Sequence, residues 1–297
     1  MPVCRLCEHD QSLRNSHIIP RFVTKWLLES SPTRGLRDVN TPNLRRQDGL
    51  TMPLLCAACE EVFSPWEGHF AAKVFFPLHK NTGSTFPYGS WGLKFAASVV
   101  WRVLTHSFEH GHGRLTQDQV ALANAAQQTW RAFLIGTANH PGRFEIHAFP
   151  LDVLPVLPGA GMSPFLNRYL LRATDGEVVF SQKEILVYAK LCRIMLVGHV
   201  VVKDQGRWRP SRLSVVRGTL GGRHDYYLPT TLRHYLDQCA TRAGKSFASE
   251  SVKQKGERRT RMEQDLPGLV RSEVFRAMRA DLAQSGPDAF AVTGDLS

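Results

Sequence analysis

The sequence lacks the long apolar runs that membrane-spanning helices need. Such a helix takes about 18 consecutive apolar residues, and every apolar stretch in this chain is broken earlier by polar or charged residues. Residues 1–10 also lack the apolar core of a secretory signal and carry Arg5, Glu8 and Asp10 instead. We therefore expect a cytoplasmic protein that has no membrane partner.

Cysteine is scarce, with 6 among 297 residues. A reducing cytosol leaves little use for disulfides, so two C-x-x-C units favour a metal site. Each unit turns tightly enough to aim two thiolates at one ion, and a closed zinc site takes four ligands in a tetrahedron. Redox chemistry is the alternative, but the usual β-α-β setting of a redox C-x-x-C motif is missing around Cys4. The sequence predicts one structural Zn²⁺ held by Cys4, Cys7, Cys56 and Cys59.

Acidic residues are also in deficit, since 37 Lys and Arg residues face 26 Asp and Glu residues. Residues 203–261 contain fourteen of the basic residues and five acidic ones. This concentration is typical of a surface that binds a phosphate backbone, although a solvated basic face would have the same composition. We expect nucleic acid, with DNA the first candidate, as the partner. The expected contacts are Arg207, Arg209, Arg212, Arg258, Arg259 and Arg261.

The distribution of turn-forming residues divides the chain near residue 80. Residues 1–80 hold the paired cysteines and many turn formers, and a run of helix breakers follows at 80–84. Residues 81–285 are expected to form a larger α+β domain, mainly helical with a small sheet and a basic C-terminal portion. Residues 286–297 are expected to be a disordered tail. The predicted fold class is therefore α+β.

Hydrophobic periodicity predicts two helices between residues 91 and 136, the second with a capping box from Thr116 to Gln119 and a stop at Gly136. A helix capped by Ser181 is expected at 182–196, and another after Pro229. Residues 253–263 are expected to be a solvated helix or a mobile linker. Strands are expected at 144–149, 177–180 after an Asp175-Gly176 turn, 199–202 and 213–216.

Between the cysteine pairs lies the segment Asn15-Ser16-His17-Ile18-Ile19-Pro20. Residues 4–69 resemble the Cys4-type HNH endonucleases of the His-Me finger group. There a first C-x-x-C precedes an Asp-His-Ile-x-Pro element, and a second C-x-x-C opens a helix. The same residues also resemble uncharacterised bacterial proteins that have a Ser-His-Ile-Ile-Pro element between two C-x-x-C pairs. The resemblance implies an N-terminal ββα-metal zinc finger.

In the resembled enzymes a histidine activates water, and the residue before it and one on the helix hold a divalent metal. The resemblance implies that His17 is this base, that Ser16 stands at the metal-binding aspartate, and that Glu60 replaces the asparagine or histidine after the last cysteine. Glu60 and Glu67 share one helix face, so the two carboxylates could jointly hold catalytic Mg²⁺ or Mn²⁺. Alternatively, both acids simply favour the positive end of the helix and face water.

Two functions remain open on the sequence. The first is an HNH-like metal-dependent endonuclease that hydrolyses phosphodiester bonds of nucleic acid, with His17 and Glu60 as catalytic residues. The second is a catalytically degenerate zinc finger that binds nucleic acid or a protein partner without cleavage. Retention of His17 favours the enzyme, whereas Ser16, Thr51 and Glu60 depart from the signature and favour the binding protein.

Overall fold

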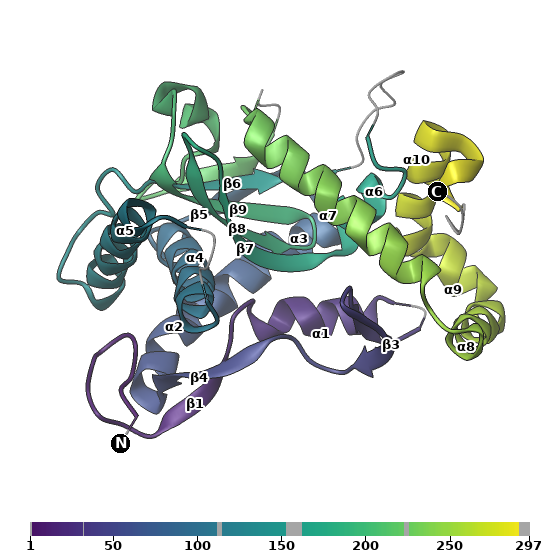
Figure 1. Ribbon diagram of the computed structural model, residues 1–297, viewed down its shortest axis with the longest axis horizontal. Helices are drawn as coiled ribbons and strands as arrows, with labels where there is room; N and C mark the ends of the chain where they lie inside the picture. The colour runs from purple at the N-terminus through teal and green to yellow at the C-terminus, as the bar shows by residue number, and fades with distance from the viewer. Residues whose placement is uncertain (1, 32, 112–114, 153–161, 223–225, 291–297) are drawn as a thin grey trace. The chain divides into compact units, whose positions relative to one another are not determined.

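The structure is a computed structural model that describes residues 2–31, 33–111, 115–152, 162–222 and 226–290 (Figure 1). It mixes helices with small antiparallel sheets, which confirms the α+β class. The chain forms two compact units, each assembled from separate segments. The first contains Met1–Pro20, Leu50–Pro150 and Asp175–Thr231, and the second contains Arg21–Gly49, Leu151–Thr174 and Leu232–Ser297. The predicted boundary near residue 80 is not tested by this division and stays a prediction.

A four-stranded sheet in the order β6-β9-β8-β7 forms the core of the first unit. Its strands are β6 (Ile146–Pro150), β7 (Thr174–Phe180), β8 (Ile185–Leu191) and β9 (Ile194–Val201). Strand β9 pairs antiparallel with both β6 and β8. Every residue of β8 is buried, and so is every residue of β9 except Val201. The two central strands are therefore covered on both faces.

This double burial explains why the helix predicted at 182–196 is wrong. A strand buried on both faces reads as a continuous apolar run, which lacks the alternation that distinguishes a strand from a helix. The predicted Asp175-Gly176 turn is also wrong, because both residues lie inside β7. The strand expected at 213–216 is absent from the described residues. Its place is taken by β10 (Gly218–Gly221), which pairs antiparallel with β5 (Thr85–Tyr88).

One face of the sheet is covered by α4 (Trp91–Glu109) and α5 (Gln117–Ile135), which lie side by side (Figure 1). The predicted helix pair is confirmed, and so is the capping box, in which Gln119 N–H donates to the Thr116 hydroxyl and the Gln119 side chain accepts from Thr116 N–H. Gly136 ends α5 with φ of 86°, a value that suits glycine. Trp130 of α5 packs directly on the backbone of Gly198 in β9.

The N-terminal part of this unit pairs two strands and follows them with a helix. Strand β1 (Leu13–His17) pairs antiparallel with β4 (Thr51–Cys56), and α2 (Ala57–Phe70) begins at once after β4. The helix continues as a π-helical turn η1 (Ala71–Phe75) and ends in α3 (Phe76–His79). A 3-10 helix, η2 (Gln205–Ser211), follows β9.

The second unit is mainly helical. Its elements are α1 (Arg21–Glu29), the hairpin of β2 (Leu36–Asp38) and β3 (Thr41–Arg46), α6 (Leu166–Arg172), α7 (Thr230–Ala248), α8 (Val252–Gln264), α9 (Leu266–Arg271), α10 (Glu273–Ser285) and η3 (Gly286–Ala289). The buried carboxylate of Asp281 joins α10 to α6, because it accepts from Asn167 N–H at 2.7 Å and from the Arg168 side chain at 2.7 Å.

The helix predicted after Pro229 is confirmed as α7. Of the two alternatives for residues 253–263, a solvated helix or a linker, the structure has the helix, α8. Helix α8 has no buried residue, as its charged sequence indicates. Of the predicted tail, residues 291–297 lie outside the described residues. Within the described ranges, each helix is too short or too polar to cross a membrane.

Candidate functional site

The four predicted zinc ligands come together in the first unit. Their sulfur atoms lie within 4.8 Å of one another, and the Sγ atoms of Cys7 and Cys56 are 4.0 Å apart. Four Zn–S bonds of 2.3 Å in a tetrahedron would hold the sulfurs roughly 3.8 Å apart. The cluster therefore has the size and the donor set of a closed zinc site, and the residues present fit this metal.

Backbone hydrogen bonds shape both halves of the cluster. Cys4 N–H donates to the His9 carbonyl at 3.0 Å, and Glu8 N–H donates to the Cys4 carbonyl at 2.8 Å. The first cysteine pair, Cys4 and Cys7, therefore lies in a closed loop. The second pair stands at a strand-to-helix junction, with Cys56 ending β4 and Cys59 in the first turn of α2. Cys56 N–H donates to Cys4 Sγ at 3.3 Å, which joins the two halves directly.

The thiol pKa values reflect this crowding. Burial raises the pKa of Cys4, but N–H donors from Cys7, Cys56 and Leu6 outweigh it and lower the pKa to about 7. Burial raises the pKa of Cys7, and burial together with the neighbouring thiols raises that of Cys59. Four thiolates are therefore not stable side by side without a cation, and metal binding must displace their protons.

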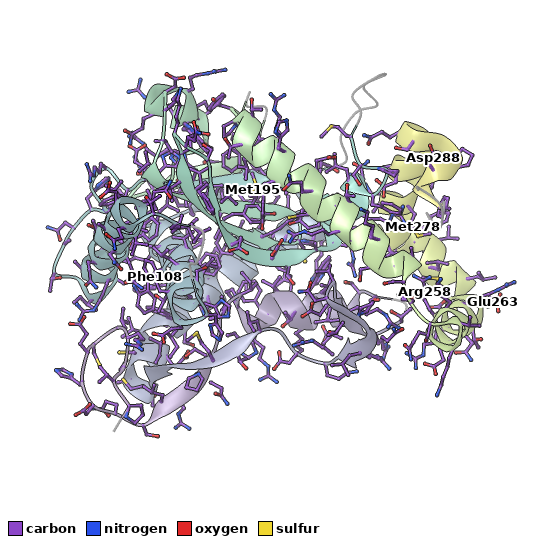
Figure 2. All side chains as sticks on the ribbon, in the orientation of Figure 1. Phe108, Met195, Arg258, Glu263, Met278 and Asp288 are labelled. Atoms are coloured by element: carbon purple, nitrogen blue, oxygen red, sulfur yellow. The ribbon has the colours of Figure 1, made fainter. Side chains whose placement is uncertain are left out.

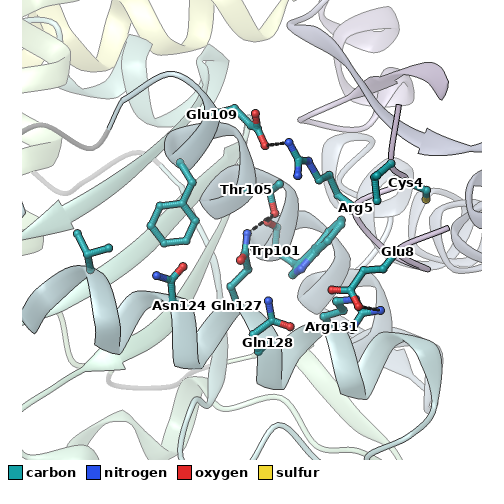
Figure 3. A pocket seen from close by; sticks show the side chains of 13 residues that line it. Cys4, Arg5, Glu8, Trp101, Thr105, Glu109, Asn124, Gln127, Gln128 and Arg131 are labelled. Carbon is teal, nitrogen blue, oxygen red and sulfur yellow. Dashed lines mark hydrogen bonds and ion pairs between the residues drawn. The ribbon is translucent and has the colours of Figure 1, made fainter. Parts of the chain in front are cut away.

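Ion pairs hold the first cysteine loop against α4 and α5, around a polar cavity of about 350 Å³ (Figure 3). Arg5 pairs with Glu109 of α4 at 2.5 Å, and Glu8 pairs with Arg131 of α5 at 2.9 Å. Arg131 also donates to the Leu6 carbonyl at 2.7 Å. These contacts attach the cysteine loop to the α4–α5 helix pair, which favours a preorganised metal site.

The predicted catalytic residues lie around the end of β1. Ser16 is buried, and its hydroxyl donates to the Glu60 carboxylate of α2 while accepting from Leu55 N–H at 3.3 Å. His17 is half-buried, and its carbonyl accepts from Arg102 at 2.8 Å. The structure thus brings the side chains of residues 16 and 60 into contact, and His17 is the next residue along β1.

Glu67, the other predicted metal ligand, already has a cationic partner. The guanidinium of Arg102, only 2% exposed, lies 2.7 Å from the Glu67 carboxylate. The same guanidinium donates to the carbonyls of His17 and Ser98. This contact favours a role for Glu67 in holding Arg102, and through it the end of β1, over a role as a cation ligand.

The predicted nucleic-acid contacts divide between the two compact units. Arg207, Arg209 and Arg212 are exposed side chains on or beside η2, and Arg212 pairs with Glu145 at 2.8 Å. On α8, Arg259 pairs with Glu263 at 2.8 Å and Arg258 with the buried Glu250 at 3.5 Å. Figure 2 labels Arg258 and Glu263 on this helix. Arg261 donates to the Thr33 carbonyl. Several of these cations therefore already have an intramolecular partner.

A second cluster of metal-binding residue types lies on the sheet and was not predicted from the sequence. Ligand atoms of Glu145, His147 and His199 fall within 4.8 Å of one another. The alternation at 144–149 does place Glu145 and His147 on one strand face, but His199 is distant in sequence and was assigned no role. Burial, with a contribution from His147, lowers the pKa of His199 to about 2.

Comparison with protein-family models, with curated proteins and with solved structures finds no match to this chain. The resemblance to HNH endonucleases therefore depends on the motif residues alone.

Proposed function

We propose that the chain is an HNH-like, metal-dependent endonuclease that hydrolyses phosphodiester bonds of nucleic acid, with DNA as the first candidate substrate. The observation that carries the proposal is the contact between Ser16 and Glu60, with His17 as the next residue along β1. These two positions match the two metal-binding positions of the resembled enzymes, and the adjacent position matches their general base. The order β1, β4, α2 around the cysteine cluster supports a ββα-metal finger that holds a structural zinc ion.

In this mechanism His17 accepts a proton from the attacking water through a neutral imidazole. Glu60 supplies a carboxylate oxygen and Ser16 a hydroxyl oxygen, both hard donors that suit Mg²⁺ or Mn²⁺. A divalent ion bound there would neutralise charge on the scissile phosphate. Arg102 positions the base, because its guanidinium binds the His17 carbonyl and is itself oriented by Glu67.

A second candidate is a zinc-stabilised module that binds nucleic acid or a protein partner without cleaving it. The specific observation in its favour is that both carboxylates on this face of α2 already have partners. Glu60 accepts from the buried Ser16 hydroxyl, and Glu67 pairs with Arg102. A cation at Glu60 would have to displace a hydrogen bond that already satisfies the carboxylate.

The deciding experiment is a cleavage assay on duplex and single-stranded DNA across a series of divalent cations. We expect His17→Ala to lower the rate by about 10² to 10⁴-fold, the range for loss of a general base. Glu60→Gln should weaken the response to Mg²⁺ or Mn²⁺, because an amide is a poorer ligand than a carboxylate. Ser16→Asp should raise the rate by restoring a charged ligand.

The matched control is His69→Ala, which removes an exposed histidine from α2, the helix that also carries Glu60. The His69 ring stacks on Trp91, and its removal should leave cleavage unchanged. All variants must contain wild-type amounts of zinc, since His17, Glu60 and His69 are outside the cysteine cluster. No cleavage by the wild type with any cation, together with retained DNA binding in His17→Ala, would contradict the endonuclease proposal and favour the binding module.

A further inference from the structure

Glu145, His147 and His199 converge on the face of the sheet opposite α4 and α5. In the pairing of β6 with β9, His147 lies opposite Val197 and Ile146 opposite Gly198. Gly198 faces Trp130 of α5, so His199, the next residue, points to the other face. His147 and His199 are therefore diagonal neighbours on that face, and their rings stack at 4.0 Å between centroids.

The hydrogen bonds around His147 determine which of its ring nitrogens carries a proton. The Ser211 hydroxyl donates to the Trp208 carbonyl at 2.9 Å, so its oxygen accepts from Nδ1–H of His147 at 3.0 Å. Nε2 of a neutral ring then carries a lone pair. This nitrogen faces Oε2 of Glu145 at 3.7 Å, a distance too long for a hydrogen bond. Two electron-pair donors thus face each other.

His199 adds a third donor that the protein leaves unsatisfied. Its side chain is 1% exposed, and neither ring nitrogen has a hydrogen-bond partner among the described residues. The ring lies against the indole of Trp208, 4.4 Å away between centroids. A buried polar group without a partner destabilises the fold, so a ligand that satisfies a ring nitrogen of His199 would stabilise it.

We propose that Glu145, His147 and His199 bind a divalent transition-metal ion, separate from the ion of the cysteine cluster. Two ligands at roughly 2.0–2.1 Å from one tetrahedral ion lie about 3.4 Å apart, close to the 3.7 Å between His147 Nε2 and Glu145 Oε2. An ion between these atoms would turn the facing donors into common ligands. The same ion would take one nitrogen of His199.

The surrounding groups are arranged as outer partners of such a ligand set. Arg212 binds Oε1 of Glu145 at 2.8 Å and leaves Oε2 toward the histidines. Ser211 holds the tautomer of His147 that presents Nε2. Metal-ligating histidines and carboxylates commonly have partners of this kind, which orient them.

Two imidazoles and one carboxylate select the chemical class of the ion. Imidazole suits Zn²⁺, Co²⁺, Ni²⁺ and Fe²⁺, whereas Mg²⁺ and Ca²⁺ prefer oxygen ligands throughout. By the usual order of affinities, Zn²⁺, Co²⁺ and Ni²⁺ bind more tightly than Mn²⁺. Three protein ligands also leave a coordination position for water or a small anion.

Co²⁺ titration of the full-length, metal-stripped protein tests the proposal. Co²⁺ bound to four thiolates has intense sulfur-to-metal charge-transfer absorption, which Co²⁺ bound to nitrogen and oxygen lacks. Every protein in the titration carries Glu60→Gln, so that the cation proposed at Glu60 does not add a further equivalent. We expect this background to bind two equivalents, one with and one without the charge-transfer absorption. His199→Gln should bind only the equivalent with charge transfer, and Cys56→Ser only the equivalent without it.

The matched control is His79→Gln, which replaces another buried histidine whose Nδ1 and Nε2 already contact Phe75 and Arg193. This variant should keep both equivalents. Ser211→Ala should weaken the second equivalent by about 10 to 100-fold, as expected for loss of an outer partner. Binding of one equivalent by the Glu60→Gln background, or retention of two after His199→Gln is added to it, would overturn the proposal. Because the background lacks the Glu60 carboxylate and no nucleic acid enters the experiment, its result is independent of the proposed nuclease activity.

Discussion

The Arg102 side chain of α4 connects the end of β1 with α2. It is 2% exposed and donates to Glu67, to the His17 carbonyl and to the Ser98 carbonyl of its own helix. A buried guanidinium is stabilised only when its donors are paired and hydrogen-bonded. These three acceptors, drawn from α2, β1 and α4, meet that requirement.

Removing this guanidinium should be costly, because the partly buried carboxylate of Glu67 would be left without its cation. We expect Arg102→Met to lower the free energy of unfolding by about 2–4 kcal/mol, measured by urea denaturation. The double variant Arg102→Met/Glu67→Met should recover part of that loss, since it removes both charges. Strictly additive losses from the two single substitutions would show that the pair is not coupled.

Among the elements, the β8–β9 hairpin has the greatest influence on the metal site proposed at Glu145, His147 and His199. Its two strands are apolar along almost their whole length, and β9 brings His199 beside β6. On the opposite face, the sheet accepts the Trp130 ring only because position 198 has no side chain. A Cβ at that position would lie 2.7 Å from the ring and 3.4 Å from Val100.

Gly198→Ala should therefore overpack the interface between β9 and α5. We expect a loss of about 1–3 kcal/mol in the free energy of unfolding, the usual range for inserting atoms into a filled core. Gly206→Ala is the matched control, because no atom lies within 4 Å of a Cβ built there, and it should change stability by less than about 0.5 kcal/mol. Equal effects of the two substitutions in thermal or urea unfolding would contradict the packing argument.

For the whole molecule, the excess of positive charge is the property that acts at long range. The net charge is +11, and a charge of this size favours association with polyanions. Intramolecular acids neutralise part of it, as at Glu145 and Glu250. Only a measurement of salt dependence separates cations that contact phosphates from those that face water.

If α8 contacts phosphates, substitution of Arg258, Arg259 and Arg261 by Gln should flatten the dependence of DNA affinity on salt. The slope of log affinity against log salt should fall by about 0.9 for each phosphate that is no longer bound by an arginine. The matched control substitutes three exposed lysines outside the basic segment, Lys25, Lys73 and Lys80, and should change the slope less. The same slope in the two triple variants would show that α8 contributes only general charge.

Features that depend on neighbours in sequence were predictable. The spacing of each C-x-x-C pair, the capping box from Thr116 to Gln119 and the stop at Gly136 all involve atoms only a few residues apart, so local chemistry decides them. The α+β class followed from the same local patterns. The helix predicted at 182–196 was wrong, because strands that are buried on both faces lose the alternation by which strands are identified.

Contacts between residues that are distant in the chain were decided only by the tertiary structure. The sequence pairs Cys4 with Cys7 and Cys56 with Cys59, but the pairing of β1 with β4 brings the two pairs together. The placement of Arg102 against Glu67, and of His199 against Glu145 and His147, likewise depends on how helices and strands pack. Periodicity describes which face of an element is buried, whereas the partner on that face is chosen by packing of the whole unit.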